Sequence, residues 1–293
     1  DKSDFQVFKS FNRYIMKSRR NFLKLTTAGL IAAGASPVRV SAAALPANYS
    51  FAGPLTLGMA GYTFREFTVE QTIEIMKKTG VTFLSLKDFH MPMNSTKQQI
   101  DSVIGKFRSA GITVYTVGVI YMKTPEEVDR AFDYAKMAGV SMIVGAPDYD
   151  LLPYVEKKVR EYDFRLAIHN HGPDNPLFPN ATDIWDHVKN LDPRMGICID
   201  IGHTMRDGAD PAADILKYAS RIYDVHIKDV DKATKEGTTV EIGRGIIDIP
   251  GVISALRKIG YTGKCSLEYE KDMHDPLAGI AESLGFLRGV MAF

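Results

Sequence analysis

The sequence is poor in cysteine and has no excess of charge of either sign. Only two cysteines, Cys198 and Cys265, occur among 293 residues, which excludes a small scaffold held together by disulfides. The 36 basic and 35 acidic residues nearly cancel, and 45% of the chain is hydrophobic, so an intrinsically disordered chain is also excluded. The length allows one large domain or two ordinary ones.

The few surplus charges are unevenly distributed along the chain. Residues 1–44 hold eight of the 36 basic residues and two of the 35 acidic ones, so residues 45–293 carry 28 basic and 33 acidic residues, a formal net charge of −5. A body of that sign has no overall electrostatic attraction for nucleic acid or for an anionic membrane surface. We therefore expect neither as a partner.

The N-terminal segment has the layout of an export signal. Residues 18–24 read Ser-Arg-Arg-Asn-Phe-Leu-Lys, and an uncharged, mildly apolar run at 25–35 and a small-residue stretch up to 44 follow. These are the parts of a cleavable signal peptide, and the paired arginines resemble the twin-arginine type. The apolar run is too short to span a bilayer. We expect residues 1–44 to be removed and the protein to be periplasmic or otherwise exported; the alternative is an amphipathic N-terminal helix.

From residue 45 onward, short apolar runs alternate with helical patterns. Strands are predicted near 55–59, 82–87, 112–119, 141–146, 165–170, 196–201, 222–228 and 264–269. Helices are predicted near 68–79, 97–110, 125–138, 150–162, 181–190, 210–219, 250–259 and 276–290, with Gly80, Gly139 and Gly260 as stop signals. Eight strand–helix units in about 250 residues predict the α/β class and a single (β/α)₈ TIM barrel over 45–293.

The main competing fold is an open, doubly wound sheet. That fold would need a glycine-rich phosphate loop after the first strand, and residues 58–62, Gly-Met-Ala-Gly-Tyr, do not supply one. The barrel also places the predicted strands of Cys198 and Cys265 apart, so we expect both thiols to be free.

Strand alternation places ionisable groups inside the predicted barrel. In the fifth strand, Leu166 and Ile168 share the face toward the helices, whereas His169 faces inward. The next three strands end in the same way, and the ends of barrel strands form the catalytic face. The inward-facing groups near the four strand ends are His169, Asp200, His226, Lys228, Glu268 and Glu270.

Four of these groups form a mixed nitrogen and oxygen donor set. His169, Asp200, His226 and Glu268 would suit one divalent ion such as Mn²⁺, Zn²⁺, Co²⁺ or Fe²⁺. Burying such groups without partners costs several kcal/mol, so they must be paired, hydrated or bound to a cation. An ion with open positions could bind a hydroxyl–carbonyl pair and stabilise an enediolate. The alternative for each histidine alone is a hydrogen-bonded structural role.

Three further residues lie at the predicted catalytic face. Lys87 ends the second strand on the inner side, where it contacts substrate or pairs with Asp88. His171 follows the fifth strand, as a loop contact to substrate or as a surface residue. His203 either hydrogen-bonds the substrate or caps the next helix.

With these residues identified, the sequence over 55–293 resembles the xylose isomerase-like TIM-barrel superfamily of sugar isomerases and epimerases, which also includes inosose dehydratases and the endonuclease IV proteins. The resemblance rests on Asp-x-Gly-His at 200–203, His-x-Lys-Asp at 226–229, Gly-Arg-Gly at 243–245 with Asp248, and Ser-x-Glu at 266–268. It implies that Asp200 and His226 are the middle metal ligands and that Glu268 is both a ligand and a base. Lys228 and Arg244, within these motifs, are then expected to bind substrate. Family members often associate, which leaves a homo-oligomer open.

The fifth strand departs from the epimerase pattern. Where epimerases carry a first glutamate, this sequence has His169, which weakens the case for two-base epimerisation. A similar histidine-rich fifth strand occurs in the inosose dehydratases. The resemblance implies a metal-dependent isomerase or epimerase acting on a non-phosphorylated sugar or ketosugar, or alternatively a lyase that eliminates water or an alcohol from a ketosugar or 3-keto-glycoside. Glu268 would be the base, with His169 or His203 as an acid.

Two hypotheses from other functional classes are an endonuclease and a sugar-binding protein. An endonuclease would need a denser metal cluster and a positive groove, which the charge of −5 over 45–293 argues against. A non-catalytic sugar-binding barrel is compatible with the replaced glutamate of the fifth strand. Turnover and sensitivity to chelation distinguish it from an enzyme.

Overall fold

A closed ring of eight parallel strands forms the centre of the protein. The computed structural model describes residues 54–293, and the predicted export signal lies outside them. The strands are β1 (Thr56–Ala60), β2 (Phe83–Leu86), β3 (Thr113–Met122), β4 (Met142–Pro147), β5 (Arg165–His169), β6 (Met195–Asp200), β7 (Ile222–Ile227) and β10 (Lys264–Leu267). Their order around the ring is β1-β10-β7-β6-β5-β4-β3-β2, and every neighbouring pair is parallel. The predicted (β/α)₈ barrel is confirmed.

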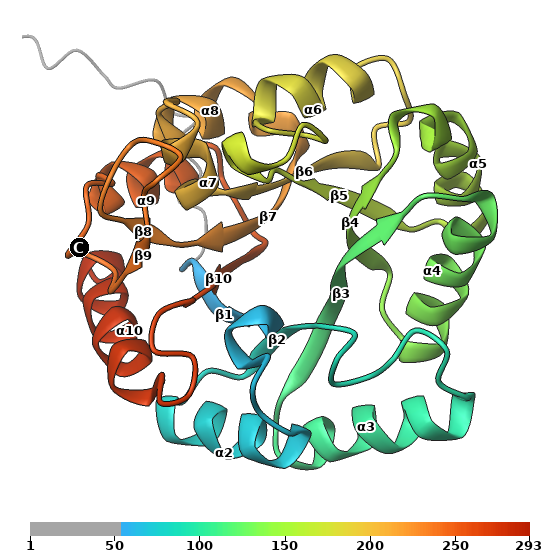
Figure 1. Ribbon diagram of the computed structural model, residues 1–293, viewed down its shortest axis with the longest axis horizontal. Coiled ribbons are helices and arrows are strands. Elements are labelled where there is room, and N and C mark those ends of the chain that lie inside the picture. Colours follow the sequence, from blue (N-terminus) through green and yellow to red (C-terminus); the bar gives the residue numbers. More distant parts are fainter. Residues whose placement is uncertain (1–53) are drawn as a thin grey trace, which may run out of the picture. The chain divides into compact units, whose positions relative to one another are not determined.

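An outer layer of helices surrounds the ring (Figure 1). Its members are α2 (Val69–Thr79), α3 (Lys97–Ser109), α4 (Pro125–Ala138), α5 (Leu152–Tyr162), α6 (Ala181–Val188), α8 (Pro211–Lys217), α9 (Ile249–Lys258) and α10 (Leu277–Met291). Each lies within a few residues of its predicted range. Within residues 54–293, no helix combines the length and apolarity needed to cross a bilayer.

Local sequence signals explain where the helices begin and end. The hydroxyls of Thr68 and Thr96 accept hydrogen bonds from the third residues of α2 and α3, and both helices have complete capping boxes. Thr124 caps α4, which has proline in its first turn. Gly80 and Gly139 end α2 and α4 in the left-handed region, at φ 69° and 76°. The glycine stops at these two positions are therefore confirmed.

The sequence patterns miss several short elements. Helix α7 (Ile201–Arg206) begins directly after β6, and strands β8 (Asp229–Val230) and β9 (Thr239–Val240) form a separate antiparallel pair between β7 and α9. Such elements are too short to show a period of 3.6 or 2. Four 3₁₀ turns complete the described fold: η1 (Gly61–Phe64), η2 (Tyr149–Leu151), η3 (Gly172–Asp174) and η4 (Ala219–Arg221).

The apolar residues divide between two regions, as strand alternation predicts. Leu166 and Ile168 belong to the large core between strands and helices, whereas a small cluster of Val144, Ala167 and Cys198 fills the barrel interior. The small interior residues leave the ends of the barrel to polar side chains. Cys198 on β6 and Cys265 on β10 are buried free thiols on strands that are not neighbours, as expected.

Candidate metal centre and active site

The C-terminal ends of β5, β6, β7 and β10 bring the four predicted ligands together. One potential ligand atom from each of His169, Asp200, His226 and Glu268 lies within 4.8 Å of the others. His169 Nε2 is 3.2 Å from His226 Nδ1, and His226 Nδ1 is 3.4 Å from Glu268 Oε2. All four side chains are buried. The alternation of side chains along the strands therefore correctly predicted that these four residues lie together.

A buried lysine lies among the carboxylates of this cluster. Lys228 Nζ is 3.2 Å from Asp200 Oδ2, 3.1 Å from Glu268 Oε2 and 3.3 Å from Glu270 Oε2. The side chain of Lys228 is only 2% exposed, so its charge must be balanced locally. When Glu270 is ionised and His226 is neutral, the three carboxylates and one ammonium leave two negative charges, which a divalent cation would balance.

The carboxylates of Asp200 and Glu268 are held in the ionised form. Burial alone would raise the pKa of each, but Lys228 and the neighbouring histidines outweigh it. The pKa of Asp200 falls well below its usual range, and that of Glu268 falls to about 2. Both groups are therefore anionic acceptors or ligands at neutral pH. Burial raises the pKa of Glu270.

The imidazoles near the cluster are mostly neutral. Burial lowers the pKa of His169 far below 6.5 and lowers the pKa of His203 to about 4. At His226 burial acts in the same direction, but Cys198 and Glu268 outweigh it and raise the pKa, so a cation binding there must displace a proton.

An unsatisfied buried oxygen supports the fit of this cluster to a metal ion. Asp200 Oδ2 accepts no hydrogen bond within the described part of the chain, and its nearest cation is Lys228 Nζ at 3.2 Å. Buried oxygens without a hydrogen bond are uncommon in folded proteins. Two imidazoles and two carboxylates also match the preference of Mn²⁺, Zn²⁺, Co²⁺ and Fe²⁺ for nitrogen and oxygen donors. The residues present therefore fit one divalent ion.

A cavity of about 360 Å³ opens above the cluster. Lys87 lines it and forms the ion pair with Asp88 that was one of its two expected contacts, at 2.9 Å. Its Nζ also donates to the Val119 carbonyl at 2.7 Å. His171 also lines the cavity, with its ring 4.9 Å from that of His169. His171 is thus half-buried in the cavity wall.

His203 lies in the cavity wall near the start of α7. Asp200 is the residue that caps this helix, because its Oδ1 accepts a hydrogen bond of 2.8 Å from the His203 backbone N–H. The next predicted helix is observed as α8, and Asp210 caps it. The helix-capping alternative for His203 is therefore wrong, and its side chain lines the cavity. Asp200 has two roles, since its other oxygen points toward the metal cluster.

Lys228 and Arg244 do not lie where a substrate contact was expected. Neither is among the side chains that line the cavity above the cluster. Lys228 lies behind the carboxylates, and its stem passes Gly202, where a Cβ would come within 2.7 Å of Lys228 Cγ. This close approach explains the glycine of the Asp-x-Gly-His motif.

Arg244 points to the outer helix layer instead. Its guanidinium donates to both carboxylate oxygens of Glu282 at 2.5 and 2.7 Å, and its side chain is 61% exposed. The glycines on either side, Gly243 and Gly245, donate their backbone N–H groups to Asp229 at 2.9 and 3.0 Å. The Gly-Arg-Gly motif thus shapes a loop around Asp229.

Sequence reasoning missed two tyrosines that line the cavity, Tyr62 and Tyr121. The Tyr121 hydroxyl lies 2.7 Å from Nε2 of His171, which lines the same cavity. Strand β3 continues to Met122, beyond the predicted end at 119, and its register with β4 shifts between Val117 and Ile120. The irregularity breaks the alternation that located the other residues.

Comparison with known families agrees with this arrangement. A family model described as a xylose isomerase-like TIM barrel matches residues 59–290. The chain belongs to this family. The match covers most of the described barrel and confirms the resemblance drawn from the strand-end motifs.

Two curated relatives are similar over part of the chain. The rhizopine catabolism protein MocC of Rhizobium meliloti is 27% identical over 157 residues, which are 44% of this chain and 48% of MocC. The inosose dehydratase of Lacticaseibacillus casei is 25% identical over 131 residues, 39% of this chain and 43% of the dehydratase. The matched regions thus span about half the length of these relatives or less.

Solved structures share the fold over most of its length. A protein of Parabacteroides distasonis is 27% identical, with a TM-score of 0.63, over 80% of this chain and 98% of its own. IolI, solved with a bound zinc atom, is 16% identical with a TM-score of 0.67, over 81% of this chain and 98% of IolI. The 3-keto-D-glucoside 4-epimerase YcjR of E. coli is 15% identical with a TM-score of 0.66, over 80% of this chain and 99% of YcjR. The last two likenesses show the fold alone.

Proposed function

We propose that this protein is a divalent-metal-dependent enzyme that removes a proton beside a carbonyl group of a non-phosphorylated ketosugar or 3-keto-glycoside. The observation that carries the proposal is the convergence of His169, Asp200, His226 and Glu268 within 4.8 Å at the mouth of a cavity. Family membership supports a sugar-modifying reaction, because relatives include dehydratases and an epimerase by name.

The side chains around the cavity have separable tasks in this proposal. A bound divalent ion would polarise the substrate carbonyl and make the neighbouring C–H more acidic. Glu268, ionised and facing the cavity, accepts that proton. Lys87 and His203, from other walls, donate hydrogen bonds to substrate oxygens. The buried position of Lys228 keeps the carboxylates fixed for these roles.

From the sequence, isomerisation or epimerisation is the first hypothesis and elimination is the alternative. The geometry instead favours elimination. The fifth strand contributes His169 instead of a second carboxylate, and the nearby wall carries the hydrogen-bonded pair of Tyr121 and His171. After Glu268 takes the α-proton, the C–H electron pair forms a C=C bond and the β-substituent departs. Protonated by the Tyr121–His171 pair, it leaves as water or an alcohol, and the product is an enone. The inosose dehydratases are curated relatives whose name supports this branch.

Isomerisation or epimerisation is the second candidate. The observation in its favour is Glu270, a second carboxylate that lines the same cavity, together with the fold shared with YcjR. In this reaction the proton returns to carbon and no group leaves.

Two features support a free sugar as the substrate. Among the described residues that line the cavity, Lys87 is the one lysine or arginine, whereas phosphate sites usually offer several donors of this kind or a helix N-terminus. The export signal predicted at residues 1–44 also favours a periplasmic or otherwise exported location, where phosphorylated sugars are scarce.

Proton exchange in D₂O tests the proposal. Protein loaded with Mn²⁺ or Co²⁺ is incubated with free sugars, 3-ketosugars and inososes, and ¹H NMR follows the α-proton. We expect loss of the α-proton signal with at least one ketosugar, followed by an enone if elimination is correct or an epimer if it is not. Ligand binding that survives chelation, without exchange or turnover, would leave a sugar-binding barrel as the function.

A further inference from the structure

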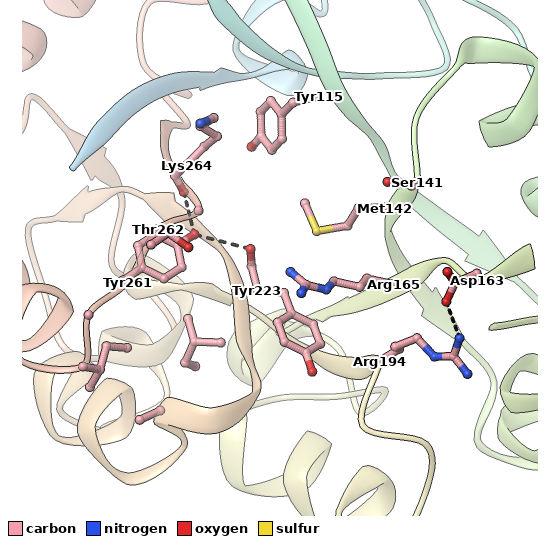
Figure 2. A pocket seen from close by; sticks show the side chains of 15 residues that line it. Tyr115, Ser141, Met142, Asp163, Arg165, Arg194, Tyr223, Tyr261, Thr262 and Lys264 are labelled. Atoms are coloured by element: carbon pink, nitrogen blue, oxygen red, sulfur yellow. Dashed lines mark hydrogen bonds and ion pairs between the residues drawn. The ribbon is translucent and has the colours of Figure 1, made fainter. Parts of the chain in front are cut away.

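A second and larger cavity lies at the opposite end of the barrel. Its volume is about 680 Å³, within the range of small-molecule sites. It is lined by residues at or near the starts of β4, β5, β7 and β10, including Met142, Arg165, Tyr223 and Lys264 (Figure 2). Because all strands of the barrel are parallel, this end faces away from the metal cluster.

Two cations of this cavity have no carboxylate partner within residues 54–293. Arg165 and Lys264 make no ion pair there, but each lies over an aromatic ring. The Arg165 guanidinium is 5.0 Å from the centroid of Tyr223, and the Lys264 ammonium is 4.1 Å from that of Phe83. Cation–π contacts of this kind hold a side chain in place and leave its N–H groups free to donate.

Three other residues of the lining are held in place by their neighbours. Arg194 also lines the cavity, and its charge is already balanced by Asp163 and Asp192 at 2.5 and 2.9 Å. The ring of Tyr223 lies so close to Gly196 that a Cβ at that glycine would collide with it. Tyr115 contributes to the lining while its hydroxyl is engaged with Asp224 and Ser266, at 3.0 and 2.7 Å.

The charge of this cavity is opposite to that of the protein body. Its lining contains three cations and one carboxylate, Asp163, which is committed to Arg194, whereas residues 45–293 carry a formal net charge of −5. A concave positive region in an otherwise negative molecule concentrates anions.

We infer that this cavity binds a small molecule bearing a compact dianionic group, either a phosphomonoester or a dicarboxylate. The planar guanidinium of Arg165 matches the spacing of two phosphate or carboxylate oxygens, and Lys264 supplies the second positive charge. The site is separate from the sugar cavity, and it does not depend on the reaction proposed there.

Titration calorimetry on metal-stripped protein tests this inference. Inorganic phosphate and succinate are the probes, glucose is the neutral control, and all titrations are run at equal ionic strength. We expect phosphate or succinate to bind, and the R165Q/K264Q variant to bind that anion at least about tenfold more weakly. The tighter of the two anions identifies the ligand class.

The matched control removes the same charge elsewhere. K123Q/K157Q changes two exposed lysines outside the cavity and should bind like the parent protein. If R165Q/K264Q does not fold, the R165K variant keeps the charge but loses the planar fork, and weaker binding by R165K carries the test. Equal weakening in K123Q/K157Q, unchanged binding in R165Q/K264Q or R165K, or no anion binding at all would overturn the inference.

Discussion

The two ends of the barrel carry opposite chemistry on the same strands. Strand β5 begins with Arg165 and ends with His169, and β10 begins with Lys264 and is followed by Glu268. Between the ends, the interior holds small residues such as Ala167 and Cys198. Asp224 is the exception in the interior, where it is buried beside Cys198 and accepts a hydrogen bond of 3.0 Å from the Tyr115 hydroxyl. The other charged groups compared here lie at the two ends, because the closed middle of a small barrel has little room for water.

The difference between the ends is one of burial as well as sign. At the C-terminal end the ionisable groups are buried and compensate one another, with Lys228 in contact with three carboxylates. At the N-terminal end Arg165 is exposed and Lys264 is half-buried, and both are supported by aromatic rings. Substitutions at the C-terminal end should therefore have larger effects on both catalysis and stability.

The largest effect is expected for Glu268→Gln. Loss of the carboxylate removes the base, so α-proton exchange should fall by about 10²- to 10⁴-fold. The matched control is Glu282→Gln, which changes an exposed glutamate paired with Arg244 and should leave exchange unchanged. Metal content is measured in both variants, and near-parental exchange in Glu268→Gln would assign the base to another residue.

Lys228→Met should destabilise the metal-free protein strongly. It leaves buried carboxylates without their cation, which costs about 3–5 kcal/mol in comparable buried pairs. Chemical unfolding measures the loss, and added Mn²⁺ should restore more stability to the variant than to the parent. Lys271→Met, which breaks a partly exposed pair with Glu241 at 2.8 Å, should cost no more than about 1 kcal/mol. Equal losses would contradict the proposed difference between buried and exposed charges.

Tyr121→Phe should have a moderate effect on turnover. The variant loses the 2.7 Å hydrogen bond to His171, so turnover should drop about tenfold, with a shifted acidic or basic limb in its pH profile. Tyr154→Phe, which loses a bond of 2.9 Å to Asp129 on the outer surface, is the control. An unshifted profile with parental turnover would remove the Tyr121–His171 pair from the mechanism.

The most gradual predicted effect is on the pH dependence of stability. Burial lowers the pKa of His203 to about 4 in the folded protein, below the unfolded value of about 6.5. The unfolded state therefore binds the extra proton first, and stability falls as the pH drops from 6.5 to 4, by at most about 1.4 kcal/mol per pH unit for this residue.

Unfolding of metal-free variants between pH 4 and 7 checks this slope. His203→Gln should flatten it, whereas His274→Gln, at an exposed position, and R165Q/K264Q at the other end should leave it unchanged. A slope that R165Q/K264Q alters as much as His203→Gln would mean that the two ends do not titrate separately.

Alternating patterns predicted the barrel and its metal cluster because both depend on regular strands. Every inward residue from His169 to Glu268 followed from parity alone. Tyr121 did not, since β3 changes register before reaching it. Alternation also placed Lys228 inward, but it did not predict that the ammonium would pair with three carboxylates. The position of Arg244 beside Glu282 depends on loop packing and a long flexible stem, which strand alternation does not encode.

Binding of Co²⁺ to metal-free protein tests the central claim most directly. Calorimetry together with the visible spectrum should show one ion bound per chain, and the ion should raise the melting temperature. In the D200A/H226A variant, both the spectrum and the stabilisation should disappear. Failure of the parent protein to bind Co²⁺, or binding that persists in D200A/H226A, would contradict a metal centre at the C-terminal end of the barrel.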